Sequence, residues 1–92
     1  MYRLFRSTQF NKQVKKLMKS GSFETTELIK IFDILANNLP FHEHHRNHKL
    51  HGEYGGMYEC HIRPDLLLIY KKNKEKQMIT LVEIGSHSEL FE

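Results

Sequence analysis

The sequence predicts an α+β domain, in which two helices cover one face of a mainly antiparallel sheet in the order β-α-α-β-β-β. Three observations support this fold class. Apolar residues recur at helical spacing in two stretches between residues 8 and 36, apolar or alternating runs fill residues 57–84, and turn-forming residues separate these stretches. A chain of 92 residues has room for one domain with a small core.

The first strand and helix are predicted near the N-terminus. Apolar and basic side chains alternate over residues 2–6, which indicates a short strand at a sheet edge. Ser7 or Thr8 supplies a side-chain oxygen that can cap a helix ending at Gly21. The apolar stripe of that helix comprises Phe10, Val14, Leu17 and Met18.

A second helix is predicted to follow after a short connection. Ser22 is its expected cap, and the helix ends before Asn37-Asn38-Leu39-Pro40. Because few residues join the two helices, we expect an antiparallel hairpin packed on one face of the sheet. The stripe that faces the core comprises Leu28, Ile31, Phe32 and Leu35.

The three remaining strands follow a polar loop, residues 41–56, with a brief strand near Leu50. Residues 57–63 alternate, so that Tyr58, Cys60 and Ile62 face one side and Met57, Glu59, His61 and Arg63 face the other. Residues 66–70 form an apolar run typical of a central strand. A two-residue turn at Pro64-Asp65 would place Arg63 opposite Leu66, His61 opposite Leu68 and Glu59 opposite Tyr70. A basic turn, residues 71–76, precedes a last strand over residues 77–84.

Composition limits the classes of protein that fit. The formal net charge of +3 permits a polyanionic partner without requiring one. The single cysteine, Cys60, excludes an internal disulfide framework and suits a reducing compartment. The chain has no apolar run of roughly 20 residues and no signal-peptide pattern at the N-terminus, so we expect a cytoplasmic protein with no membrane partner.

Histidine is the residue type that suggests chemistry, and five of the seven histidines fall within residues 42–51. Three interpretations compete. A metal site is disfavoured because the spacing matches no closed Cys/His framework, so no metal or cofactor is predicted. A solvated loop is the simplest account of four of them: His42, His44, His45 and His51. The third interpretation is acid-base work by His48, His61 and His87, with Asp65 and Glu59 as orienting carboxylates.

RNA cleavage fits this third interpretation because the substrate carries its own nucleophile, the ribose 2′-hydroxyl. A base removes its proton, the oxygen attacks phosphorus, and an acid protonates the leaving 5′-oxygen. Cations can stabilise the charge gathered at phosphorus, and Arg63, Arg46 and Lys49 are the candidates. An aromatic side chain such as Phe91 can stack on a base, although a lone Phe near a C-terminus more often packs on its own core.

Three spaced motifs carry a family resemblance. They are His48-x-Leu-x-Gly, Glu59-x-His61-x-x-Pro64-Asp65-x-x-Leu-x-Tyr70 and Gly85-Ser-His87-x-x-Leu-Phe91. With the order of elements, they resemble the YafQ branch of the RelE/ParE superfamily of bacterial toxins. The resemblance implies a RelE-like fold and a ribosome-dependent endonuclease that cuts mRNA in the ribosomal A site. It also implies a DinJ/RelB-like antitoxin, encoded beside the toxin, that neutralises it.

The resemblance further implies site residues. It places catalytic histidines at His48, His61 and His87, a catalytic aspartate at Asp65 and a C-terminal aromatic at Phe91. Glu59 stands where the family often has an acidic residue and is expected among the substrate-binding residues, and Arg63 is expected near phosphate. His48 is expected as the general base and His87 as the general acid, with the two roles open to exchange.

The chain departs from the family pattern at Leu66, where a tryptophan is common, which leaves base stacking and codon preference open. A non-enzymatic protein is the alternative to a nuclease. It would be either a gyrase inhibitor of the kind found in another branch of the superfamily, or a basic RNA-binding module.

Overall fold

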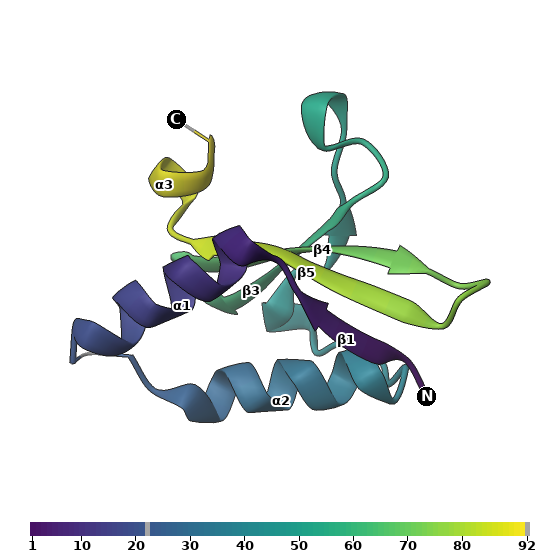
Figure 1. The fold of residues 1–92 in the computed structure, drawn as a ribbon, viewed down its shortest axis with the longest axis horizontal. Coiled ribbons are helices and arrows are strands. Elements are labelled where there is room, and N and C mark those ends of the chain that lie inside the picture. The colour runs from purple at the N-terminus through teal and green to yellow at the C-terminus, as the bar shows by residue number, and fades with distance from the viewer. Residues whose placement is uncertain (22, 92) are drawn as a thin grey trace.

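A computed structural model of the chain describes residues 1–21 and 23–91 and confirms the α+β class (Figure 1). The elements are β1 (Arg3–Arg6), α1 (Thr8–Lys19), α2 (Thr25–Ala36), η1 (Glu43–His45), β2 (His48–Lys49), η2 (Gly52–Tyr54), β3 (Tyr58–Arg63), β4 (Leu66–Asn73), β5 (Met78–Gly85) and α3 (His87–Phe91); η1 and η2 are single 3-10 turns. The sheet order is β1-β5-β4-β3-β2, with β1 parallel to β5 and every other pair antiparallel. In the described residues, no helix combines the length and the apolar character needed to cross a membrane.

The first helix begins as predicted. The Ser7 hydroxyl accepts a hydrogen bond from the Phe10 amide at 3.0 Å and donates to the Val82 carbonyl at 2.7 Å, which ties the helix start to β5. The prediction that Met18 belongs to the buried stripe is wrong, since Met18 is 59% exposed. Met18 belongs to the last turn of α1, which extends past the sheet (Figure 1).

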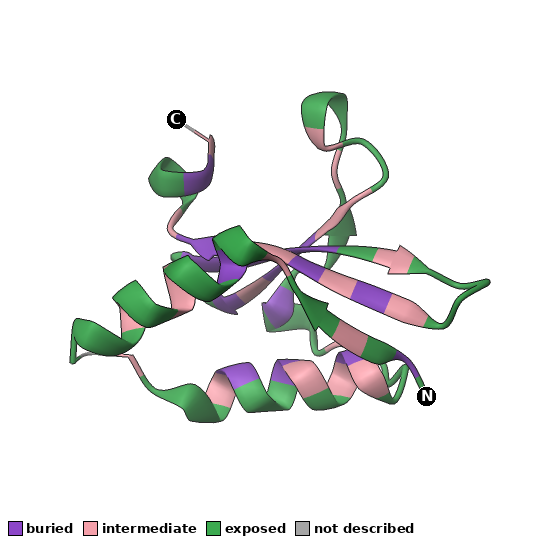
Figure 2. Cartoon of the chain, in the orientation of Figure 1, coloured by how far each residue is buried: buried purple, intermediate pink, exposed green. Residues whose placement is uncertain are grey.

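The second helix starts at Thr25, with Glu24 in the capping position and no side-chain cap bond. Ser22, the predicted cap, lies outside the described residues. Both helices pack on one face of the sheet, as predicted, and the buried residues of α2 lie on the side of the helix that faces the sheet (Figure 2). That core includes Phe10, Leu28, Ile31, Leu35, Cys60, Ile62, Leu66, Leu68, Tyr70, Ile79, Leu81 and Ile84.

The central strand, β4, is buried on both faces, as its continuous apolar run predicts. Leu66, Leu68 and Tyr70 face the helices, whereas Leu67 and Ile69 face the opposite side. On that opposite side they join a second, smaller cluster completed by Leu90 and flanked by Leu50, Tyr54, Met57, Val82 and Phe91. The η2 loop and α3 therefore rise from the face of the sheet that α1 and α2 leave open (Figure 1).

The predicted register of the β3–β4 hairpin is wrong beyond its first pair. Arg63 does pair with Leu66, but His61 pairs with Leu67 and Glu59 with Ile69, one residue away from the prediction. The cause is an irregularity between His61 and Arg63, where β3 holds one residue more than its partner. The bulge is close to the turn, so every later pair is shifted.

The C-terminal segment forms a short helix that periodicity did not predict. Ser86 and Glu89 cap it reciprocally: the Ser86 amide donates to Glu89 Oε1 at 2.8 Å, and the Glu89 amide donates to Ser86 Oγ at 3.2 Å. The first of these bonds is the main reason that the pKa of Glu89 lies below its ordinary value. The capping box and the buried Leu90 fix α3 against the sheet.

Candidate active site

The first pair of the site is made by β2, a two-residue strand that pairs with β3 and sets His48 opposite Glu59. His48 Nε2 lies 3.0 Å from Glu59 Oε2. The imidazole is half exposed, with 52% of its side chain accessible, while the Glu59 residue is only 6% exposed. A buried carboxylate therefore meets an accessible imidazole on the open face of the sheet.

His61 lies on the other side of the same carboxylate. Its Nε2 is 3.9 Å from Glu59 Oε1, and its Nδ1 is 3.3 Å from the Pro64 carbonyl. His48 is held in the same manner, because its Nδ1 is 2.7 Å from the Arg46 carbonyl. A carbonyl only accepts hydrogen bonds, so both Nδ1 atoms carry a hydrogen.

These contacts constrain the protons of the pair. With Nδ1 protonated, a neutral His48 would present the lone pair of Nε2 to the lone pairs of Glu59, which is repulsive. At 3.0 Å the two groups must share a proton, either as imidazolium with carboxylate or as imidazole with carboxylic acid. His48 and Glu59 together thus form a proton-holding pair whose imidazole is open to solvent.

His87 and Asp65 form the second group. Asp65, in the β3–β4 turn, accepts a hydrogen bond from the His87 backbone amide at 3.2 Å through Oδ1. The carboxylate therefore holds the first residue of α3 beside the hairpin, rather than contacting the His87 ring. No described residue donates to or accepts from the His87 ring nitrogens, and the ring packs on Phe91 with centroids 5.0 Å apart.

The structure brings the four predicted catalytic residues to one part of the open face. His48 and His61 flank Glu59, His61 bonds the Pro64 carbonyl, and the next residue, Asp65, holds α3. Leu67 connects the two groups across the sheet, because it pairs with His61 on one side and with Gly85, just before α3, on the other. The resulting row runs from His48 to His87.

Two of the three predicted cations are not in this row. The Arg63 guanidinium lies over the Phe23 ring, 5.8 Å from its centroid, and the Lys49 ammonium lies over the Tyr58 ring, at 5.9 Å. Phe23 and Tyr58 both pack against the helix-side core, so these charges point away from the histidines. Arg46 adjoins the row through its backbone, since its carbonyl lies 2.7 Å from His48 Nδ1, and the residue is exposed.

Two further predicted residues have roles narrower than expected. Glu59 was expected to contact substrate, but its burial restricts it to orienting the imidazoles. Phe91 is half-buried against the second cluster and packs edge-on to Tyr54, with centroids 5.4 Å apart, so much of its surface serves the fold.

Sequence reasoning missed Tyr54, which fastens the open-face cluster. Its hydroxyl reaches Glu83 Oε2 and the Leu90 carbonyl, each at 3.2 Å, and so joins the η2 loop to β5 and α3. Burial, with Glu83 nearby, raises the pKa of Tyr54 above its ordinary value. The signal that could have found it is the single large aromatic in an otherwise small and polar loop, residues 51–56.

The remaining loop histidines differ in exposure. His42, His44 and His51 are exposed, as expected for a solvated loop, but the same expectation is wrong for His45, which is 5% exposed. Its ring packs edge-on to Phe41 with centroids 5.9 Å apart. Burial is the main cause that lowers the pKa of His45, and the neighbouring His44 and His42 lower it further.

Comparison with known proteins shows the family. Residues 2–92 match the family model described as bacterial toxin of type II toxin–antitoxin system, YafQ. The mRNA interferase toxin YafQ of Escherichia coli K12 is 31% identical over 86 residues, covering 92% of this chain and 90% of that protein.

Solved structures agree with the match in sequence. A crystal structure of a metal-bound toxin from Helicobacter pylori has a TM-score of 0.91 at 38% identity, covering 99% of this chain and all of that one. YafQ in the DinJ–YafQ complex of E. coli has a TM-score of 0.86 at 29% identity, covering both chains completely. The chain therefore belongs to the YafQ family of bacterial toxins from type II toxin–antitoxin systems.

Proposed function

We propose that this chain is an endoribonuclease that cuts mRNA in the A site of the ribosome and so inhibits translation. The observation that carries the proposal is the buried Glu59 carboxylate between His48 and His61, on the open face that also presents His87. The similarity to E. coli proteins named mRNA interferase toxins supports the substrate class.

The proposed reaction is an internal transesterification of RNA. A base takes the proton of a ribose 2′-hydroxyl, whose oxygen forms a bond to the adjacent phosphorus while the bond from phosphorus to the 5′-oxygen breaks. An acid gives a proton to that leaving oxygen. The products are a 2′,3′-cyclic phosphate and a free 5′-hydroxyl. Acid-base groups are sufficient for this scheme, so the proposal includes no metal ion or cofactor.

The hydrogen bonds favour one of the two assignments that the sequence leaves open. We assign His48 as the general acid: its Nε2 proton, which points at Glu59 Oε2, passes to the leaving 5′-oxygen when that oxygen replaces the carboxylate as its acceptor, and the ring is accessible to substrate. His87 is then the general base, since no described residue occupies its ring nitrogens. This reverses the expected order and uses the exchange that the resemblance permits.

The other residues position these two or bind substrate. Glu59 is a positioning residue for His48 and His61, and Asp65 is a positioning residue for His87 through the α3 backbone. Arg46 is the cation that we place near the phosphate, and the exposed part of Phe91 is available to a base.

We also propose a cognate antitoxin as partner, a DinJ-like protein encoded beside the toxin. Support comes from the DinJ–YafQ complexes of E. coli, in which the relative of this chain is bound to such a protein. Cytoplasmic translation is the setting that this function requires.

Primer extension on a message translated in a purified system tests the proposal. Wild type should give codon-phased cuts that depend on ribosomes, and His87→Gln should abolish them while keeping the native circular dichroism spectrum. Intact message together with inhibited DNA supercoiling would contradict the proposal and favour a gyrase inhibitor.

A further inference from the structure

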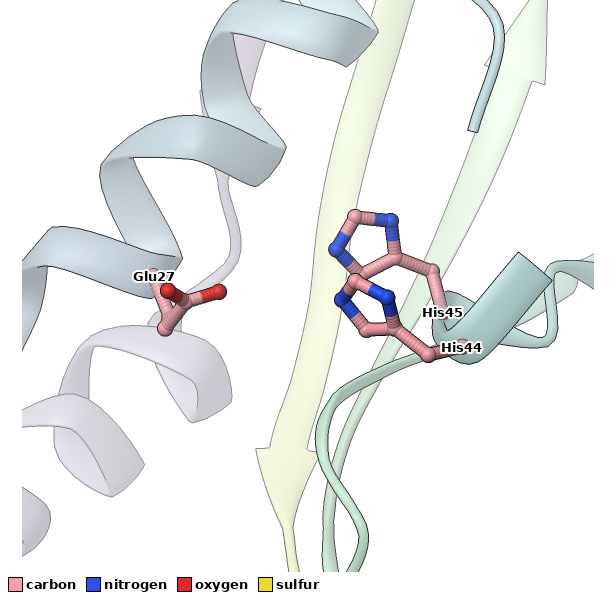
Figure 3. A group of neighbouring side chains, drawn as sticks. All are labelled: Glu27, His44 and His45. Carbon is pink, nitrogen blue, oxygen red and sulfur yellow. The ribbon is translucent and has the colours of Figure 1, made fainter. Parts of the chain in front are cut away.

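Three side chains that could act as metal ligands lie together outside the row from His48 to His87, which is called the acid-base row below. Glu27 comes from the first turn of α2, and His44 and His45 come from η1. One ligand atom from each can be chosen so that all three lie within 4.8 Å of one another. Figure 3 shows that a nitrogen of each ring points toward the Glu27 carboxylate across a small gap.

We propose that these three residues bind a divalent first-row ion of the zinc class. Two imidazoles and one carboxylate are a donor set that such ions accept, with bonds of about 2.0–2.2 Å and a fourth position for water. Tetrahedral bonds of that length place ligand atoms about 3.4 Å apart. Contraction of up to about 1.4 Å from the observed spread is within reach of side-chain rotation, because Glu27 is half-buried and His44 is exposed.

The hydrogen bonds of His44 leave one of its ring nitrogens available to a metal ion. His42 Nδ1 accepts from the His44 amide at 3.3 Å and lies 2.6 Å from His44 Nδ1. His42 Nδ1 is therefore the acceptor in both contacts, His44 Nδ1 carries the hydrogen, and the lone pair of His44 Nε2 is available to an ion. Such an outer hydrogen bond fixes the tautomer of a metal-binding imidazole.

Binding costs two existing contacts. His45 Nδ1 accepts from the His42 amide at 3.2 Å, so ligation through Nε2 shifts the His45 proton to Nδ1 and breaks that bond. Lys30 lies 3.3 Å from Glu27 Oε1 on the same helix, and its exposed ammonium must move away from the incoming cation. Both contacts are long or exposed, so replacing them costs less than a metal–ligand bond gains.

The ion would cross-link α2, which carries Glu27, to η1, which immediately precedes the segment with His48. His45 packs on Phe41, which stacks on Tyr70 with centroids 6.4 Å apart, and Arg46 directly follows His45 and holds His48 through its carbonyl. The site is thus a structural clip beside the acid-base row. Its existence does not depend on the nuclease proposal.

Calorimetric titration of the metal-free full chain with Zn²⁺ tests the clip. His44→Gln and Glu27→Gln remove one ligand each at accessible positions and should weaken one binding equivalent about 100-fold or more. His51→Gln, an exposed histidine in the same loop, is the matched control and should bind like wild type. Zn²⁺ should also raise the midpoint of thermal unfolding of wild type and of His51→Gln, but not of the two ligand variants.

Glu59→Gln separates this site from the acid-base row, which also contains histidines. If the clip exists, Glu59→Gln still binds the equivalent of Zn²⁺ that His44→Gln no longer binds. Zn²⁺ binding that is unchanged in both His44→Gln and Glu27→Gln would overturn the inference, as would the loss of that same equivalent in Glu59→Gln.

Discussion

The Nε2 atom of His48 lies 3.0 Å from a carboxylate oxygen of Glu59, a residue only 6% exposed. Because His48 Nδ1 is committed to the Arg46 carbonyl, the imidazole and the carboxyl share the proton between them. In the proposed mechanism this contact orders the histidines for acid-base chemistry.

Glu59→Gln should show whether Glu59 acts through the proton that it shares with His48 or only through the space that its side chain fills. The amide fills the same space but can donate to His48 Nε2, so the imidazole becomes neutral with its lone pair occupied. We expect single-turnover cleavage of ribosome-bound message to fall about 100-fold and its pH profile to change form, while thermal stability changes little. An unchanged profile with a lower rate would instead indicate a purely structural role for Glu59.

Arg46 and Arg63 should differ as phosphate contacts. Arg46→Gln should reduce kcat/KM about tenfold or more, because the proposed mechanism assigns its guanidinium to the phosphate. Arg63→Gln is the matched control: its guanidinium lies on Phe23, away from the row, so cleavage should persist. Steady-state assays on the same translated message compare them, and equal losses in both variants would refute the placement of Arg46.

Leu90 should stabilise the fold as well as the site. It is buried against Leu67 and Ile69, so Leu90→Ala should lower the free energy of unfolding by about 2 to 3 kcal/mol. Ile29→Ala, at a position 60% exposed, should change it by less than about 0.5 kcal/mol. Urea unfolding gives both values. Truncation after Gly85 should therefore abolish cleavage and also destabilise the sheet, whereas the sequence alone predicts a largely intact sheet.

The anchoring of α3 should weaken in acid. The pKa of Glu89 is lowered from its ordinary value of 4.5, first by the bond from the Ser86 amide, so the ionised form is the one that the native state favours. Its contribution is present above pH 4.5 and is lost as pH falls through the lowered pKa. After correction for intrinsic rates, amide exchange in α3 should be faster at pH 3 than at pH 6, and this increase should exceed that in the rest of the fold. Glu89→Gln should remove that selectivity.

Cys60 should be chemically silent in the native state. Burial raises the pKa of its thiol to about 12, and the residue has no exposed surface. We expect no labelling by a thiol reagent at pH 8 under native conditions, and labelling of one thiol per chain in denaturant. Labelling at the rate of a free thiol in the folded protein would show that β3 opens readily.

Much of the fold was predictable because periodic burial defines its elements. The stripe of α2, the alternation in β3 and the continuous run of β4 each translate directly into which face is covered. The short helix α3 was not predicted, because five residues are too few for a helical period to appear in the sequence. Only its capping box, Ser86 with Glu89, marked it.

The members of the proposed site could be chosen from the sequence, but their arrangement could not. Residue type and spacing indicated His48, His61, Asp65 and His87, yet the bulge beside Ile62 decides where Arg63 points. Lys49 is on the helix side because it pairs with Tyr58 across β2 and β3, a pairing set by a strand of two residues. Such details depend on tertiary contacts rather than on local pattern.

The most direct test of the central claim uses a message in which sulfur replaces the leaving 5′-oxygen at the cleavage site, since a thiolate departs without an acid. If His48 is the general acid, His48→Gln cuts the normal message poorly and the sulfur message nearly as fast as wild type, whereas His87→Gln, which lacks the base, cuts neither. Rescue of His87→Gln in place of His48→Gln would reverse the two roles, and rescue of neither variant would contradict the assignment of a histidine general acid.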